Sequence, residues 1–282
     1  MRFHPPSTMR RPFGAMLLLI LGLVASAGSA NTGVSSRTAP SPQSYYLALG
    51  DSITYGFQPT KVEAPPSAVS GYVDLFAARL RRLAPKLEVV NYGCPGESTV
   101  TFTSGRCPWL AEGGKLHNAF RGSQLEAALS FLRAHQGRVS PITLTLWGND
   151  LAPLSARGKR APRAIATFAS RFDAILNQLR AAAPNAEMIV TGAWDPEADR
   201  LEQTKPLYRS LDTAIARVAA TSRARVANMF PVFNGPGSVA AQQARLCKLT
   251  FVCSKGDPHP TDAGYRAMAE AFMAASGYLR KP

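Results

Sequence analysis

The stretch YYLALGDSITYGFQ, residues 45–58, begins with an apolar run that ends in Gly50, Asp51 and Ser52 without any helical period. The run is typical of a buried strand, and the glycine predicts a sharp turn after it. A serine placed by such a turn lies at the C-terminal edge of the sheet, where open α/β sheets bind ligands. These residues also favour an ordinary turn, so the rest of the sequence must decide whether Ser52 has a chemical role.

Apolar runs and amphipathic segments alternate five times after residue 45. The apolar runs predict strands at 45–49, 87–93, 141–150, 186–194 and 225–230. The amphipathic segments predict helices at 71–85, 123–135, 161–184, 207–222 and 261–279. This alternation predicts an α/β domain of three layers, with helices on both faces of a doubly wound, mostly parallel, five-stranded sheet.

The N-terminal residues differ in composition from the predicted domain. Residues 1–30 have a basic start, an apolar run and small residues at the end, which is the pattern of a secretory signal peptide. Residues 31–44 are rich in Ser, Thr and Pro, so we expect a flexible leader. We therefore expect a single domain over 45–282 and a protein that is secreted to the cell envelope or beyond.

The chain is strongly basic, with a formal net charge of +14. Removing residues 1–30 removes three arginines and no acid, so the charge falls to +11. A basic secreted protein is attracted to anionic membranes or cell-wall polymers, although the arginines are scattered as on an ordinary solvated surface. Nucleic acid is excluded as a partner because no binding motif is present. We expect a monomer.

Four cysteines form two pairs that are each local in the sequence, Cys94 with Cys107 and Cys247 with Cys253. An even number of cysteines in an exported chain favours disulfides, and of the three possible pairings we expect the local one. Zinc is the alternative, but the cysteine and histidine spacings of zinc sites are missing, so we expect no metal. Each pair lies within a long connection, 94–122 or 231–260.

Polar residues follow several of the predicted strands. Ser52 follows the first strand, Gly96 the second and Asn149 the third, while Asp257 and His259 precede the last helix. In a parallel sheet these positions share one edge. A hydroxyl, a glycine N–H, a carboxamide and an imidazole are the groups that acyl transfer requires.

Four motifs in this order, GDSITYG, NYGCPGEST, WGND and DPHP, resemble those of the SGNH/GDSL hydrolase family, most like its secreted actinobacterial-type members. The resemblance covers roughly residues 45–275 and implies the flavodoxin-like fold of these esterases and lipases. It implies that Ser52 is the nucleophile, that His259 is the base and that Asp257 is its orienting acid. It also implies an oxyanion hole made by the Ser52 N–H, Gly96 and Asn149, and a reaction without a cofactor.

Two positions depart from the family pattern. Trp147 occupies the place of a glycine two residues before Asn149, and the acid precedes His259 by two residues instead of three. Prolines follow both Asp257 and His259 and favour extended backbone, in which residues two apart point to one side about 6.6 Å apart. We therefore expect Asp257 to serve as the acid, with Asp262 as the alternative.

Large aromatic residues near the motifs are candidates for substrate binding. Trp147 is expected to narrow or line the acyl pocket, and Phe102 and Trp109 either contact the acyl chain or pack the long connection. The expected function is a secreted serine esterase or lipase acting on a small ester or a lipid. The alternatives are a carbohydrate O-deacetylase and a non-catalytic surface-binding protein on a hydrolase scaffold.

Overall fold

A computed structural model describes residues 41–279 of the chain. The expected signal peptide and residues 31–40 of the expected leader lie outside the described residues, and the domain boundaries stay a prediction. None of the helices in the described part of the chain is long and apolar enough to cross a membrane.

The described residues form one five-stranded sheet in which every strand pair is parallel. Its strands are β1 (Tyr45–Gly50), β2 (Glu88–Asn91), β3 (Val139–Thr145), β4 (Met188–Thr191) and β5 (Arg225–Ala227). The strand order is β2-β1-β3-β4-β5, so the order reverses between β1 and β3. Doubly wound sheets bind ligands at this switch point, outside the carboxyl ends of the strands.

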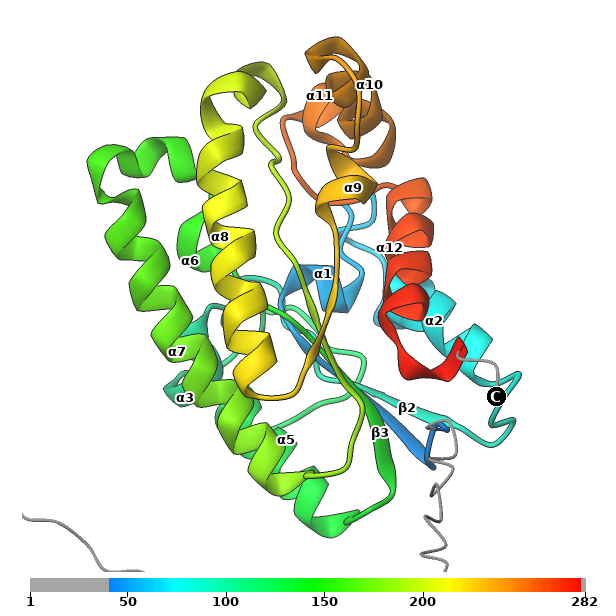
Figure 1. Ribbon diagram of the computed structural model, residues 1–282. Coiled ribbons are helices and arrows are strands. Elements are labelled where there is room, and N and C mark those ends of the chain that lie inside the picture. The colour runs from blue at the N-terminus through cyan, green and yellow to red at the C-terminus, as the bar shows by residue number, and fades with distance from the viewer. Residues whose placement is uncertain (1–40, 280–282) are drawn as a thin grey trace, which may run out of the picture. The chain divides into compact units, whose positions relative to one another are not determined.

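Helices cover both faces of the sheet, which confirms the predicted three-layer α/β fold (Figure 1). The helices that cover the sheet are α2 (Tyr72–Leu80), α5 (Gln124–Ala134), α7 (Ala161–Ala182), α8 (Leu201–Thr221) and α12 (Asp262–Ala275). Helices α2 and α12 pack together on one face, and α5, α7 and α8 pack on the other. Because both faces are covered, the central strands need continuous apolar runs rather than alternating ones.

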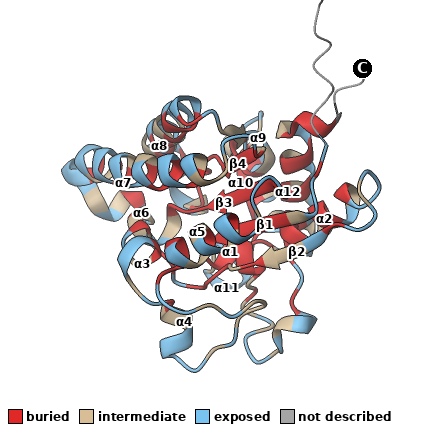
Figure 2. Cartoon of the chain, turned by 90° about the horizontal axis from the view of Figure 1, so that it is seen from below, coloured by how far each residue is buried: buried red, intermediate tan, exposed pale blue. Residues whose placement is uncertain are grey.

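The core lies between the sheet and these helices. Strand β3 is buried along its whole length, and β1 is buried after its first residue, as the red strands in Figure 2 show. Helix α7 buries one stripe of apolar side chains, including Phe168 and Phe172. The amphipathic period of such segments is what made the long helices predictable from the sequence.

The structure differs from the predicted elements mainly at their ends. Strand β3 ends at Thr145 because the residues from Gly148 begin a short helix. Helix α8 begins at Leu201, although Pro206 favours a helix boundary. The remaining α-helices are α1 (Ser52–Tyr55), α3 (Thr99–Ser104), α4 (Pro108–Ala111), α6 (Gly148–Leu151), α9 (Phe230–Phe233), α10 (Val239–Leu249) and α11 (Val252–Lys255). Five of them lie in the two long connections.

Candidate active site

The turn after β1 places Ser52 at the start of helix α1. Gly50 has a φ of +126°, and a Cβ atom there would lie 2.1 Å from the carbonyl oxygen of Thr145 on the neighbouring strand β3. Only glycine fits this turn. Asp51 caps α1, because its Oδ1 accepts hydrogen bonds from the Ile53 N–H at 3.0 Å and from the Thr145 hydroxyl at 2.8 Å. Asp51 thus fixes the turn through its carboxylate.

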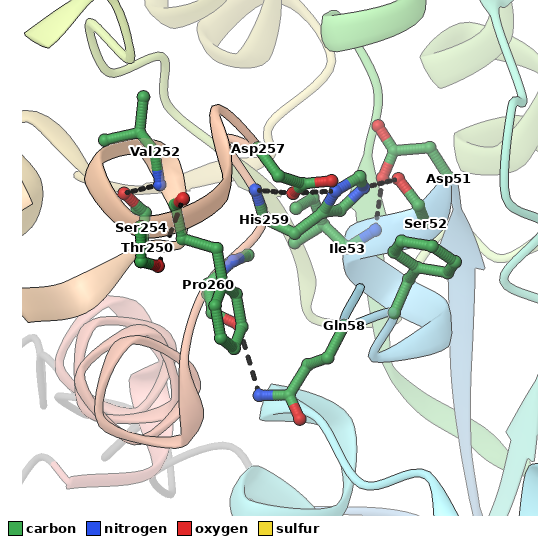
Figure 3. A network of polar contacts seen from close by, with 12 residues as sticks. Asp51, Ser52, Ile53, Gln58, Thr250, Val252, Ser254, Asp257, His259 and Pro260 are labelled. Carbon is green, nitrogen blue, oxygen red and sulfur yellow. Dashed lines mark hydrogen bonds and ion pairs between the residues drawn. The ribbon is translucent and has the colours of Figure 1, made fainter. Parts of the chain in front are cut away.

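Ser52, His259 and Asp257 form a continuous chain of polar contacts (Figure 3). His259 Nε2 lies 2.8 Å from Ser52 Oγ, and His259 Nδ1 lies 2.6 Å from Asp257 Oδ1. The same Asp257 oxygen accepts the backbone N–H of His259 at 2.8 Å. Burial raises the pKa of Asp257, but hydrogen bonding and the charge of His259 outweigh burial, so the net pKa lies below its ordinary value.

Asp262, the alternative acid, lies in the first turn of α12 and does not contact His259. Its Oδ1 accepts a hydrogen bond from Gln58 at 2.9 Å and lies 3.4 Å from Lys61 Nζ, and its side chain is 70% exposed. Asp257 is therefore the carboxylate in contact with the imidazole.

The segment that carries His259 is held at several points. The His259 carbonyl accepts the Phe251 N–H at 3.0 Å, and Pro260 forms an isolated bridge with Thr250. The ring of Phe57 packs against the imidazole with 4.6 Å between centroids. These contacts orient the imidazole toward Ser52 from a segment without regular structure.

Both disulfides have the local pairing expected from the sequence. Cys94 is bonded to Cys107, and Cys247 to Cys253, with sequence separations of 13 and 6 residues. The first connects the loop after β2 to the start of α4, and the second joins α10 to α11, just before the segment of His259. Each cross-link thus constrains a connection that borders the site.

Of the predicted oxyanion residues, Asn149 lines the same cavity as Ser52, whereas Gly96 lies outside that lining and is linked to Asn149 through its neighbour Glu97. Asn149 lies in α6, directly after β3, and its Nδ2 donates to the carbonyl of Glu97 at 2.8 Å. Glu97 follows Gly96, which has a φ of +84°. Within residues 41–279 the backbone N–H groups of Ser52 and Gly96 have no hydrogen-bond acceptor. These N–H groups can therefore donate to a bound ligand.

A cavity of about 410 Å³ opens at this contact chain. Ser52 and His259 line it together with Asn149, so the three predicted site residues face one space. Its other lining residues are Asp51, Ile53, Thr145, Trp147, Gly148, Ala152, Pro153, Thr191, Trp194, Pro196, Glu197, Asp199, Val252, Gly256 and Pro258. The lining is mostly apolar, and within the described residues it contains no lysine or arginine.

The three aromatic candidates for substrate binding have different positions. Trp147 lines the cavity and packs edge-on against Trp194, with ring centroids 4.7 Å apart. Phe102 is 0% exposed in the core, which agrees with the packing alternative and leaves it no surface for contact with a substrate. Trp109 lies outside the cavity lining and packs against Phe57, with 6.1 Å between centroids, and Phe57 in turn packs against His259.

Several residues near the site were missed by the sequence analysis. Trp194 and Glu197 line the cavity from the segment after β4. Their positions follow the same rule as Ser52 and Asn149, because they lie beyond the carboxyl end of a parallel strand. The buried pair Glu97 and Gln124 lies behind the site, and nothing in the local sequence pattern indicates that their side chains meet.

The fold, the short helix after β1 and the serine-histidine-aspartate contacts agree with the family comparison. The sequence profile of the GDSL-like lipase/acylhydrolase family matches residues 48–267. The chain belongs to this family. As a GDSL protein it is a carboxylic ester hydrolase.

Solved structures share the fold of this GDSL protein at low sequence identity. The lipase Lip_vut3 from a goat rumen metagenome is 19% identical, with a TM-score of 0.59 over 84% of this chain and 98% of that chain. The acetylxylan esterase Axe2 from Geobacillus stearothermophilus is 14% identical, with a TM-score of 0.54 over 86% and 98%. LAE5, an alpha/beta hydrolase from a Lake Arreo metagenome, is 20% identical, with a TM-score of 0.52 over 86% and 99%. No curated protein matches the GDSL chain.

Proposed function

We propose that the chain is a secreted serine esterase that hydrolyses carboxylic esters through an acyl-serine intermediate. The observation that carries this proposal is the unbroken contact chain from Ser52 through His259 to Asp257 at the mouth of the cavity. A serine hydroxyl is a weak nucleophile until a neighbouring base accepts its proton, and His259 Nε2 lies within hydrogen-bond reach of that hydroxyl.

In the first half of the reaction, Ser52 Oγ attacks the ester carbonyl carbon and its proton passes to His259 Nε2. The C=O electrons move to oxygen, and the tetrahedral intermediate carries a negative charge. The intermediate collapses when the alcohol leaves with the proton from His259, and the acyl group remains on Ser52. Asp257 holds the imidazole in orientation and stabilises its protonated form.

In the second half, His259 accepts a proton from water as the water oxygen attacks the acyl carbon. The second tetrahedral intermediate expels Ser52 Oγ, which recovers the proton, and the carboxylic acid is released. The oxyanion in both halves accepts hydrogen bonds from the N–H groups of Ser52 and Gly96 and from Asn149. The amide nitrogen of Asn149 carries two protons, and the carbonyl of Glu97 takes one, which leaves the other for the oxyanion.

The cavity is proposed to hold the acyl chain. Its apolar wall includes Ile53, Trp147, Trp194 and Val252. Burying a hydrocarbon chain there is favourable by about 0.8 kcal/mol for each CH₂ group. Export is supported by the two disulfides, which persist in oxidising compartments. The net charge of +11 that remains without residues 1–30 favours retention on anionic surfaces.

The test is hydrolysis of p-nitrophenyl esters, from acetyl to palmitoyl, by wild type, Ser52→Ala and the matched control Ser210→Ala. Ser210 lies on the exposed face of α8 and donates only to the Pro206 carbonyl. We expect Ser52→Ala to lower the rate by roughly 10⁴-fold or more while the control keeps it. Equal rates in wild type and Ser52→Ala would refute the proposal. Acetate release only from an acetylated glycan would favour the deacetylase, and surface binding without cleavage would favour the binding protein.

A further inference from the structure

Two buried polar side chains, Gln124 and Glu97, lie behind the catalytic serine and take no part in the reaction described above. Both are 1% exposed. Gln124 is the first residue of α5, and Glu97 lies in the loop after β2 that carries Gly96. Burying such groups is unfavourable unless they are hydrogen-bonded, so their contacts indicate what they do.

Gln124 binds both peptide groups of Gly50, two residues before Ser52. Its Oε1 accepts the Gly50 N–H at 2.6 Å, and its Nε2 donates to the Gly50 carbonyl at 2.9 Å. The Gly50 carbonyl also accepts the Cys94 N–H at 3.0 Å, so the side-chain amide adds to the backbone pairing at this strand end. This pair of bonds fixes the direction in which the chain leaves β1 and therefore the position of the serine.

The same Nε2 of Gln124 also donates to Glu97 Oε2 at 2.9 Å. The backbone carbonyl of Glu97 in turn accepts from Asn149 Nδ2 at 2.8 Å. A buried polar chain therefore runs from Gly50 through Gln124 and Glu97 to Asn149. It joins the ends of β1 and β3 and the loop after β2, the three segments that hold the nucleophile and the oxyanion donors.

A purely structural role explains this chain poorly. Glu97 Oε1 is buried and has no hydrogen-bond partner within the described residues. An unsatisfied buried oxygen destabilises a fold, and an apolar pair of similar volume is often as stable or more stable. The arrangement is better explained by the precision it gives to the site.

We propose that Gln124 and Glu97 are positioning residues that fix the Ser52 turn relative to the oxyanion donor Asn149. This inference rests on the proposed function of Ser52 and Asn149. Neither residue touches the ester. They act by holding the attacking Ser52 oxygen at a fixed position relative to the oxyanion donor Asn149. A displacement of about 1 Å can lower a rate by about 100-fold.

The experiment compares kcat and KM for Gln124→Leu, Glu97→Leu, their double variant and Glu97→Gln on one p-nitrophenyl ester. Gln178→Leu is the matched control, because Gln178 is exposed on α7 and donates only to the Ala174 carbonyl. Each leucine variant is expected to lower kcat by about 10- to 100-fold with KM changed less than about threefold. Glu97→Gln keeps an acceptor for Gln124 and is expected to recover most of the lost rate.

The double variant tests whether the two residues act as one unit. We expect its loss to be close to that of either single variant, because residues in one network are non-additive. Losses that multiply, a change confined to KM, or wild-type kcat in folded leucine variants would each overturn the proposal. Failure of Glu97→Gln to recover activity would overturn it too.

Folding and the proposed function are controlled separately. Circular dichroism and thermal melting report whether each variant folds. If a leucine variant does not fold, Gln124→Asn is measured in its place. The asparagine side chain is shorter than glutamine by one CH₂ and cannot reach both Gly50 and Glu97. Ser52→Ala is measured in parallel: if it keeps the wild-type rate, the proposed function fails. If Ser52→Ala is inactive while Gln124→Leu and Gln124→Asn are fully active, only the positioning proposal fails.

Discussion

Asp257 holds His259 at two points with a single oxygen, because Asp257 Oδ1 lies 2.8 Å from the backbone nitrogen and 2.6 Å from Nδ1 of the histidine. A carboxylate two residues before the histidine can do this because the intervening proline favours extended backbone and brings both side chains to one side. The shorter spacing therefore keeps the aspartate-histidine contact.

The first prediction concerns this contact. Asp257→Asn is expected to lower kcat by roughly 10³- to 10⁴-fold, because an amide can donate to Nδ1 and favour the wrong imidazole tautomer. Asp262→Asn is the matched control and is expected to keep the wild-type rate, since that carboxylate contacts Gln58 and Lys61. Steady-state kinetics on one ester measure both. A larger loss in Asp262→Asn than in Asp257→Asn would contradict the assignment.

The second prediction concerns the pH dependence of stability. Burial raises the pKa of Glu97 from 4.5 to about 7, and the Asp51 carboxylate adds to the rise, although hydrogen bonds from Thr101 and Gln124 oppose it. The folded state then binds more protons than the unfolded state between these pKa values. The contribution of Glu97 to the free energy of unfolding is therefore largest below pH 4.5. It is lost as the pH rises through 7, and the total loss is about 3 kcal/mol.

Urea unfolding of wild type and Glu97→Gln at pH 5 and pH 8 measures this effect. The glutamine carries no titrating proton, so the variant is expected to lose about 3 kcal/mol less than wild type between the two pH values. Asp51, whose pKa burial raises to about 6, is present in both proteins, so only its charge interaction with Glu97 differs between them. Glu112→Gln at an exposed site is the control. Equal losses of unfolding free energy in wild type and Glu97→Gln between pH 5 and pH 8 would show that Glu97 does not titrate in this range.

The third prediction concerns acyl-chain length. Trp147→Gly restores the family's usual residue and enlarges the cavity, so kcat/KM is expected to shift toward longer acyl chains. Removing the buried indole is also expected to lower stability by about 3–5 kcal/mol. The ester series from acetyl to palmitoyl measures the shift. Trp109→Ala, outside the cavity lining, is the control. An unchanged chain-length preference in folded Trp147→Gly would mean that the acyl chain binds elsewhere.

The fourth prediction concerns the disulfide beside the histidine segment. Replacing Cys247 and Cys253 with alanine is expected to lower stability by about 2 kcal/mol on the chain-entropy model. It is also expected to lower kcat more than the Cys94 and Cys107 double variant does, because only the second disulfide adjoins the segment of His259. Thermal melting and steady-state kinetics measure the two effects. Equal kcat in the two double variants would contradict a role for this cross-link in holding the base.

The sequence predicted what depends on local pattern and on the shared edge of a parallel sheet, but it did not indicate the buried side-chain contacts behind the site. The strand-helix alternation and the position of Ser52 after β1 were visible because each depends on neighbouring residues. The role of Phe102 stayed open between substrate contact and packing, because an aromatic residue in a long connection has the same local pattern whether it faces substrate or core. Gln124 and Glu97 were missed because their contact joins residues 27 apart in the sequence. The roles of the site residues stay a prediction until the variants are measured.

Ser52 and His259 touch across 207 residues of chain, from the end of the first strand to the segment before the last helix. A polypeptide that stops before residue 257 therefore carries the serine without its base, however well its first strands are formed. Under the proposed function, the chain is expected to be inert toward esters during synthesis until its C-terminal part has been made and has packed against the sheet. The topology would then set when activity begins.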